Sequence, residues 1–77
     1  MANFKTIKSK VYDKASYKRI ENSKIKVSLV EYYSNKDYGV IVTDESAFFF
    51  RDEDIYRGKD MDKAIEEYQK VMRLIEL

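Results

Sequence analysis

The chain has 77 residues, a formal net charge of +1 and 44% aliphatic or aromatic residues, which predicts one small folded domain over residues 1–77. Because it contains neither Cys nor His, disulfides, thiolate nucleophiles, soft metal ligands and the usual neutral-pH general base are excluded. No apolar run is long enough for a signal peptide or a membrane span, so we expect a cytoplasmic protein that does not contact a membrane.

Charge is divided unevenly along the chain. Residues 1–36 carry nine Lys or Arg against three acids, whereas residues 37–77 carry six against eleven. Such polarity can steer a charged partner. Because the acids and bases nearly cancel overall, the preferred interpretation is that the two halves face each other or only keep the fold soluble.

The first expected element is a strand over residues 4–12. Its alternation points Ile7 and Val11 to one side and Lys8 and Lys10 to the other. The segment that follows, residues 13–23, fits either a loop or a short helix, and propensity does not decide between them. The sequence therefore predicts either three or four strands.

Three further β-rich runs follow and are joined by short polar turns. The expected strands cover residues 24–33, 38–43 and 47–51, with turns at residues 34–37 and at Asp44-Glu45. If Tyr33 pairs with Tyr38, one face of the sheet gathers Ile25, Val27, Leu29, Val40 and Val42. A two-residue turn at Asp44-Glu45 leaves Val30, Ile41, Phe48 and Phe50 on the opposite face.

Apolar residues recur at spacings of three and four from Met61 to Ile75, which predicts an amphipathic helix over residues 60–76. Asp60 is the expected N-cap. The expected fold is α+β: a three- to four-stranded antiparallel sheet with the C-terminal helix packed on one face.

The residues that remain build no recognisable catalytic, cofactor or metal site, so we expect a protein that is not an enzyme. No Ser lies in a Gly-x-Ser-x-Gly elbow. The run Asp52, Glu53, Asp54 fails the EF-hand spacing, because Arg57 stands where Gly is needed and Lys63 where Glu is needed. We interpret this acidic run, with Tyr56, as a solvated loop that leads into the helix.

Nucleic-acid binding is one alternative for the basic half of the chain. Residues 36–41 weakly match an RNA-recognition strand, but a structural Tyr38 and a turn glycine at Gly39 explain them better. A phosphate-binding surface needs several cations on one side. The candidates are Lys8, Lys10, Lys24 and Lys26.

Protein binding is the preferred interpretation. Seven Tyr and four Phe are more than the thin core of such a chain can hold, and exposed aromatic residues favour interfaces. An apolar patch on the sheet face away from the helix must be covered by the segment around Phe4 and Ile7, by a second copy of the chain or by a foreign partner. The candidate partner-binding residues are Phe48, Phe50, Tyr32, Tyr33 and Tyr38, with a charged rim of Asp44, Glu45, Asp52, Glu53 and Asp54.

The size, the Lys-, Ile-, Tyr- and Asp-rich composition and the sheet-then-helix order resemble small anti-CRISPR-like and other anti-defence proteins of phages and mobile elements. The resemblance implies an inhibitor that acts in the host cytoplasm. Such a protein would bind another protein or a protein–nucleic acid complex, with the acids facing its nucleic-acid or target-recognition surface. The alternatives are nucleic-acid binding through the basic half, and a structural or oligomeric phage component, including a homodimer.

Overall fold

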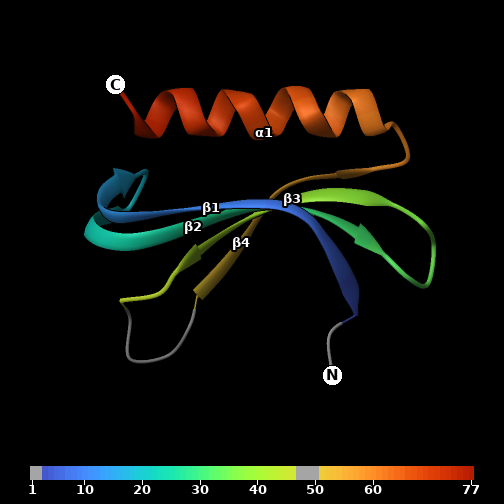
Figure 1. The fold of residues 1–77 in the computed structure, drawn as a ribbon, viewed down its shortest axis with the longest axis horizontal. Helices are drawn as coiled ribbons and strands as arrows, with labels where there is room; N and C mark the ends of the chain where they lie inside the picture. The colour runs from blue at the N-terminus through green and yellow to red at the C-terminus, as the bar shows by residue number, and fades with distance from the viewer. Residues whose placement is uncertain (1–2, 47–50) are drawn as a thin grey trace.

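The structure, a computed structural model, describes residues 3–46 and 51–77. Four antiparallel strands form one sheet, and one helix lies across one of its faces (Figure 1). The expected α+β fold is thus confirmed, with four strands. The elements are β1 (Phe4–Tyr17), β2 (Ile20–Tyr32), β3 (Tyr38–Asp44), β4 (Arg51–Gly58) and α1 (Met61–Ile75).

The sheet is a simple meander in the order β1-β2-β3-β4, so β1 and β4 are its edge strands. The segment left open between loop and helix is neither, because β1 continues to Tyr17 and β2 begins at Ile20. Lys18 makes this tight turn with a φ of 52°, in the left-handed region that non-glycine residues rarely adopt. The sequence gives no turn signal here, since Gly or Asn would be expected at such a position.

A β-bulge near Ile7 breaks the expected alternation of side chains in β1. The extra residue shifts the register by one, which moves every later side chain to the other face of the sheet. Lys8 and Lys10 lie together on the helix-covered face and Val11 lies on the other face, where it is exposed, as their predicted opposition requires. Ile7 packs on the helix side as well, so the prediction that it shares a side with Val11 is wrong. The register pairs are Lys8 with Leu29, Lys10 with Val27, and Val11 with Lys26.

The predicted apolar face of β2 and β3 is confirmed, although the register differs by two residues. Glu31, rather than Tyr33, pairs with Tyr38. Because side chains alternate with a period of two, a shift of two leaves each of them on the same face. All five predicted residues are fully or almost fully buried under α1: Ile25, Val27, Leu29, Val40 and Val42.

The last strand lies later in the chain than predicted. Asp44 pairs with Arg51, which is not the register of the predicted two-residue turn at Asp44-Glu45, and β4 continues from Arg51 to Gly58. Phe48 and Phe50 fall in the part of the predicted strand that lies outside the described residues.

The acidic run occupies β4 and does not form the predicted loop before the helix. Asp52, Glu53 and Asp54 are all exposed, as an edge strand permits, because charged side chains there discourage pairing with other chains. Ile55 and Tyr56, further along the strand, are partly buried against the core under α1. Tyr56 is thus part of the sheet and does not lie in a loop.

Helix α1 begins after Asp60, as predicted. The Asp60 carboxylate accepts a hydrogen bond from the backbone N–H of Lys63 at 3.2 Å, which satisfies one of the free donors of the first turn. Three helix residues are buried on the sheet: Ala64, Tyr68 and Val71. In the described residues, no helix has both the length and the apolar character needed to cross a membrane.

Candidate functional site

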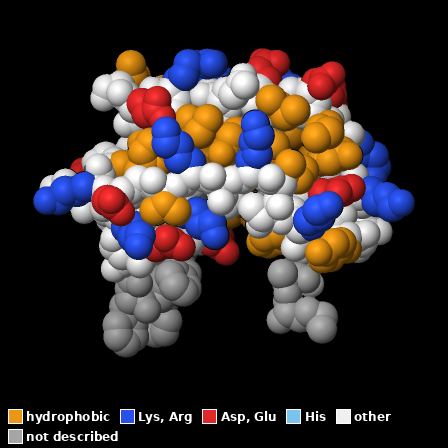
Figure 2. Space-filling view, viewed as in Figure 1, with side chains coloured by type: hydrophobic (Ala, Val, Ile, Leu, Met, Phe, Trp, Pro, Cys, Tyr) orange, Lys and Arg blue, Asp and Glu red, His pale blue; other side chains and the backbone are white. Residues whose placement is uncertain are grey.

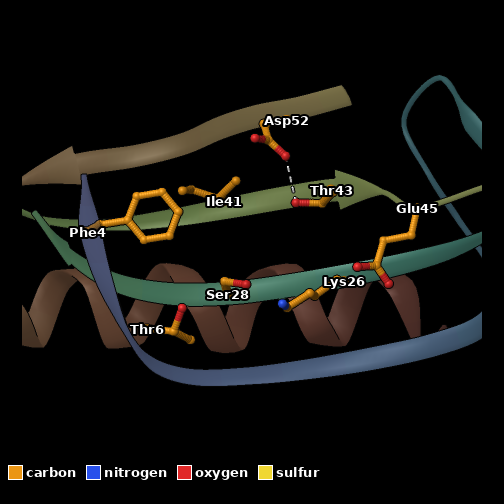
Figure 3. Close-up of a pocket in the computed structure, with 8 residues that line it drawn as sticks. All are labelled: Phe4, Thr6, Lys26, Ser28, Ile41, Thr43, Glu45 and Asp52. Carbon is orange, nitrogen blue, oxygen red and sulfur yellow. Dashed lines mark hydrogen bonds between the residues drawn. The ribbon is translucent and has the colours of Figure 1, made fainter. Parts of the chain in front are cut away.

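The face of the sheet away from α1, which we call the open face, contains a hollow of about 200 Å³. No helix of the described residues covers it (Figure 1). All four strands and the β3–β4 connection contribute side chains to the hollow (Figure 3). The lining residues are Phe4, Thr6, Lys26, Ser28, Ile41, Thr43, Glu45 and Asp52.

The floor of the hollow is only partly apolar. Ile41 belongs to a small buried cluster with Val30 and Tyr32, and Phe4 packs against this cluster with its ring edge-on to Tyr32 at 5.7 Å between centroids. Ser28 is only 7% exposed, pairs with Ile41 across the sheet and lines the hollow. A hydroxyl that lines the hollow can donate a hydrogen bond to a molecule that enters it, or accept one from it.

The wall of the hollow carries both signs of charge. Thr43 Oγ1 donates a hydrogen bond of 2.8 Å to Asp52 Oδ1, which orients this carboxylate across the β3–β4 pair (Figure 3). Lys26 and Glu45 stand at the same end of the hollow. A site for phosphate needs a concentration of positive charge, whereas this mixture of hydroxyls, one ammonium group and two carboxylates is typical of a protein interface.

A stack of three residues supports the other end of the open face. The Tyr32 ring lies over Gly39, where an added Cβ would stand 2.8 Å from its Cε2 atom, and the Arg57 guanidinium lies 3.9 Å from the ring centroid. Gly39 is therefore not the turn glycine that we expected, because it lies inside β3 and leaves room for an aromatic ring.

Asp37 holds the Arg57 guanidinium in its position over the Tyr32 ring. It accepts hydrogen bonds from Lys59 at 2.8 Å and from Arg57 at 3.3 Å. These two cations, Lys59 first, hold the pKa of the Asp37 carboxyl below its ordinary value, against a smaller opposing effect of desolvation. Burial raises the pKa of Tyr32, so its ring stays neutral beneath Arg57.

The three tyrosines predicted at the hairpin end do not form one surface. Tyr32 is buried on the open face, Tyr38 packs against the core on the helix side, and Tyr33 is 62% exposed beyond the end of β2. Neighbouring residues of a strand point to opposite faces, so the rings of the consecutive residues Tyr32 and Tyr33 do not lie side by side.

The predicted acidic rim is divided in the same way. Asp52 and Asp54 pair with Thr43 and Ile41 and so share the open face with them, near Glu45. Glu53 is on the other face, where it forms an ion pair of 3.3 Å with Lys18. Asp44 accepts a hydrogen bond from the backbone N–H of Ser46 at 3.0 Å and caps the end of β3.

The four lysines considered for nucleic-acid binding lie on both sides of the sheet. Lys26 lines the hollow and Lys24, two residues earlier in the strand, points to the same side. Lys8 and Lys10 are on the helix-covered face, and Lys10 is bonded to Glu76 at 3.2 Å. The structure therefore does not bring these cations together into one phosphate-binding surface.

Sequence reasoning missed three hydroxyls of the hollow: Thr6, Ser28 and Thr43. Only Ser28 carried a signal, because it interrupts an aliphatic run from Val27 to Val30. In the described residues, no group of three or more acidic, His or Cys side chains could hold a metal ion.

Comparisons with known proteins leave the description at the level of fold and surface. No family model matches the chain, no curated protein matches it, and no solved structure matches it. The class is thus defined by the structure itself: a small α+β meander with one covered and one open face.

Proposed function

We propose that this protein is a non-enzymatic protein-binding module and that the open face of its sheet is the contact surface. The hollow carries the proposal, because its apolar floor at Phe4 and Ile41 is surrounded by hydroxyls and by charges of both signs. This composition suits a protruding side chain of a protein partner, with polar groups around it to fix its orientation.

The acids on this face support a more specific role. Glu45, Asp52 and Asp54 make one side of the open face negative, which favours a partner with a basic surface. A nuclease complex of a host defence system exposes such a surface where it binds nucleic acid. We therefore propose that the protein acts as an inhibitor that occupies a basic surface of this kind.

Site-specific photo-crosslinking tests the location of the contact. A photoreactive phenylalanine replaces Thr6, at the hollow, or Glu66, on the exposed side of α1, and each variant is incubated with lysate of the source organism. We expect a partner protein to be cross-linked through position 6 and not through position 66. Equal cross-linking through both positions, or none through position 6, would contradict the open face as the contact surface.

Charge reversal then tests the acids with the partner that was cross-linked. We expect Asp52→Lys with Asp54→Lys to slow association by about tenfold, because rim charges act mainly on the on-rate. The matched control, Asp62→Lys with Glu66→Lys on α1, should leave the on-rate unchanged, since both residues lie on the exposed side of the helix.

The nucleic-acid alternative predicts a different result. It requires tight binding of a labelled oligonucleotide near physiological salt, with a steep loss as salt is added. If Lys24→Glu with Lys26→Glu abolished such binding, nucleic-acid recognition would replace the protein-binding proposal.

A further inference from the structure

A second hollow of about 170 Å³ lies on the other side of the sheet, between β1 and α1. Figure 2 shows hydrophobic side chains gathered in this band between helix and sheet, with basic side chains over them. Six apolar residues form most of the groove: Ile7, Leu29, Met61, Ile65, Tyr68 and Met72. Met61, at the end nearest the start of α1, is 40% exposed, so an apolar wall remains open to solvent there.

The far end of the groove is closed by a polar contact. Glu76 accepts hydrogen bonds from the Tyr12 hydroxyl at 2.5 Å and from Lys10 Nζ at 3.2 Å, which ties the end of the helix to β1. From Met61 to Met72 the helix rises by about 16 Å, which is the length of about five residues of extended chain. The groove therefore fits a short extended segment that runs alongside β1.

The edge of β1 offers main-chain pairing to such a segment. β1 is the outermost strand, so in residues 3–46 and 51–77 no strand pairs with its outer side. After the bulge near Ile7, the strand keeps a regular register from Lys8 to Tyr12. A segment that adds to this stretch would send every second side chain into the groove, as in other cases of β-strand addition.

Charge identifies the kind of segment. Lys8 lines the groove, and Lys5 lies on the same face of β1, across from Glu31. Both are exposed, and neither forms an ion pair among the described residues. β1 as a whole carries four Lys against one Asp. A second copy of β1 would place like charges opposite one another, which disfavours a dimer formed through this edge.

We propose that an extended, acidic segment of a partner protein adds to the β1 edge, with its apolar side chains in the groove and its carboxylates beside Lys5 and Lys8. This site is separate from the open face and does not depend on it. The two surfaces lie on opposite faces of the sheet, so one molecule can use both at the same time.

Selection from a phage-displayed library of random peptides tests this proposal with the folded protein as bait. We expect the selected peptides to alternate acidic with aliphatic or aromatic residues. Fluorescence polarisation should show that Lys8→Glu weakens the best peptide by at least about tenfold, and Met61→Lys should block it at the open end of the groove. The matched control is Lys70→Glu, which reverses a charge on the exposed side of α1 and should leave affinity unchanged.

Hydrogen exchange supplies a readout that simple charge attraction would not change. Bound peptide should slow exchange of backbone amides between Lys8 and Tyr12, because added main-chain hydrogen bonds protect them. The proposal is overturned if no peptide is selected, if the selected peptides lack an excess of acids, or if Lys8→Glu binds them as tightly as the wild type. It is also overturned if the protein alone self-associates by pairing β1 with the acidic β4 of a second copy. The β1 edge would then be a self-association site.

Discussion

Replacing Gly39 with Ala tests whether the Tyr32 ring is seated on the backbone of β3. The new methyl group would stand 2.8 Å from Tyr32 Cε2 and 3.1 Å from the carbonyl oxygen of Tyr56. The carbonyl is held by the sheet, so the ring must move. Displacing it disturbs the edge-on contact with Phe4 and the stacking of Arg57, which lies 3.9 Å from the ring centroid.

The expected cost follows from these contacts. Overpacking of this kind costs about 1 to 3 kcal/mol, and the disturbed aromatic and cation–π contacts add roughly 1 kcal/mol. The lower chain entropy of Ala offsets about 0.5 to 1 kcal/mol of this. We expect a net loss of about 2 kcal/mol in the free energy of unfolding, which lowers the Tm of a domain this size by roughly 8 to 16 °C. Urea unfolding followed by circular dichroism measures the loss.

Two controls make the result specific to the ring. In a Tyr32→Ala background, the further change Gly39→Ala should lose most of its cost, because the atom that it displaces is absent. Gly58→Ala should cost less than Gly39→Ala, because its closest neighbour is the hydroxyl at the end of the Tyr56 side chain, which can swing away. A Gly39→Ala variant as stable as the wild type would refute the reasoning.

The remaining predictions concern the helix and the two ion-paired carboxylates. Val71→Asp should abolish the cooperative melt, because it buries an unpaired charge at a position that is 2% exposed. Lys70→Glu, on the exposed side of the helix, should melt as the wild type does. An unchanged melt for Val71→Asp would show that α1 is not part of the core. The pKa of Asp37 is lowered chiefly by Lys59, and the pKa of Glu76 is lowered chiefly by the hydrogen bond from Tyr12. Both carboxylates therefore stabilise the fold at a pH above their ordinary pKa values. This stability is lost as the pH falls through their lowered pKa values in the folded protein. The free energy of unfolding should therefore fall below about pH 4, and less so in Asp37→Asn with Glu76→Gln; equal acid sensitivity of this variant and the wild type would contradict the assignment.

The sequence was sufficient to predict the helix and the apolar face of the sheet because both depend on periodicity. A register error of two residues between β2 and β3 left the predicted face intact, since the side-chain period in a strand is two. The bulge near Ile7 adds a single residue and therefore puts Ile7 on the same face as Lys8 and Lys10, opposite to Val11. No pattern in the sequence marks this bulge, because Ile7 is neither a Gly nor a polar residue.

The candidate site was predictable in its charged part and in the apolar floor at Ile41 and Phe4, but not in its hydroxyls. Lys26, Glu45 and Asp52 were singled out from the sequence and meet at one hollow, whereas Thr6 and Thr43 are common strand residues that carry no signal by themselves. The acidic run of β4 was predicted as a loop for a related reason. A run of three acids favours a loop unless the strand is at an edge, and edge position is a property of the assembled sheet.

The position of α1 after the four strands has a consequence for synthesis of the chain. Each strand pairs with its neighbour in the sequence, so successive hairpins can form as the chain emerges, in microseconds for each hairpin. The 15 residues of the helix take about one to three seconds to be made at roughly 5 to 20 residues per second. During that interval the nascent sheet presents Ile25, Val27 and Leu29 with nothing to cover them, and this is when a chaperone has its best opportunity to bind.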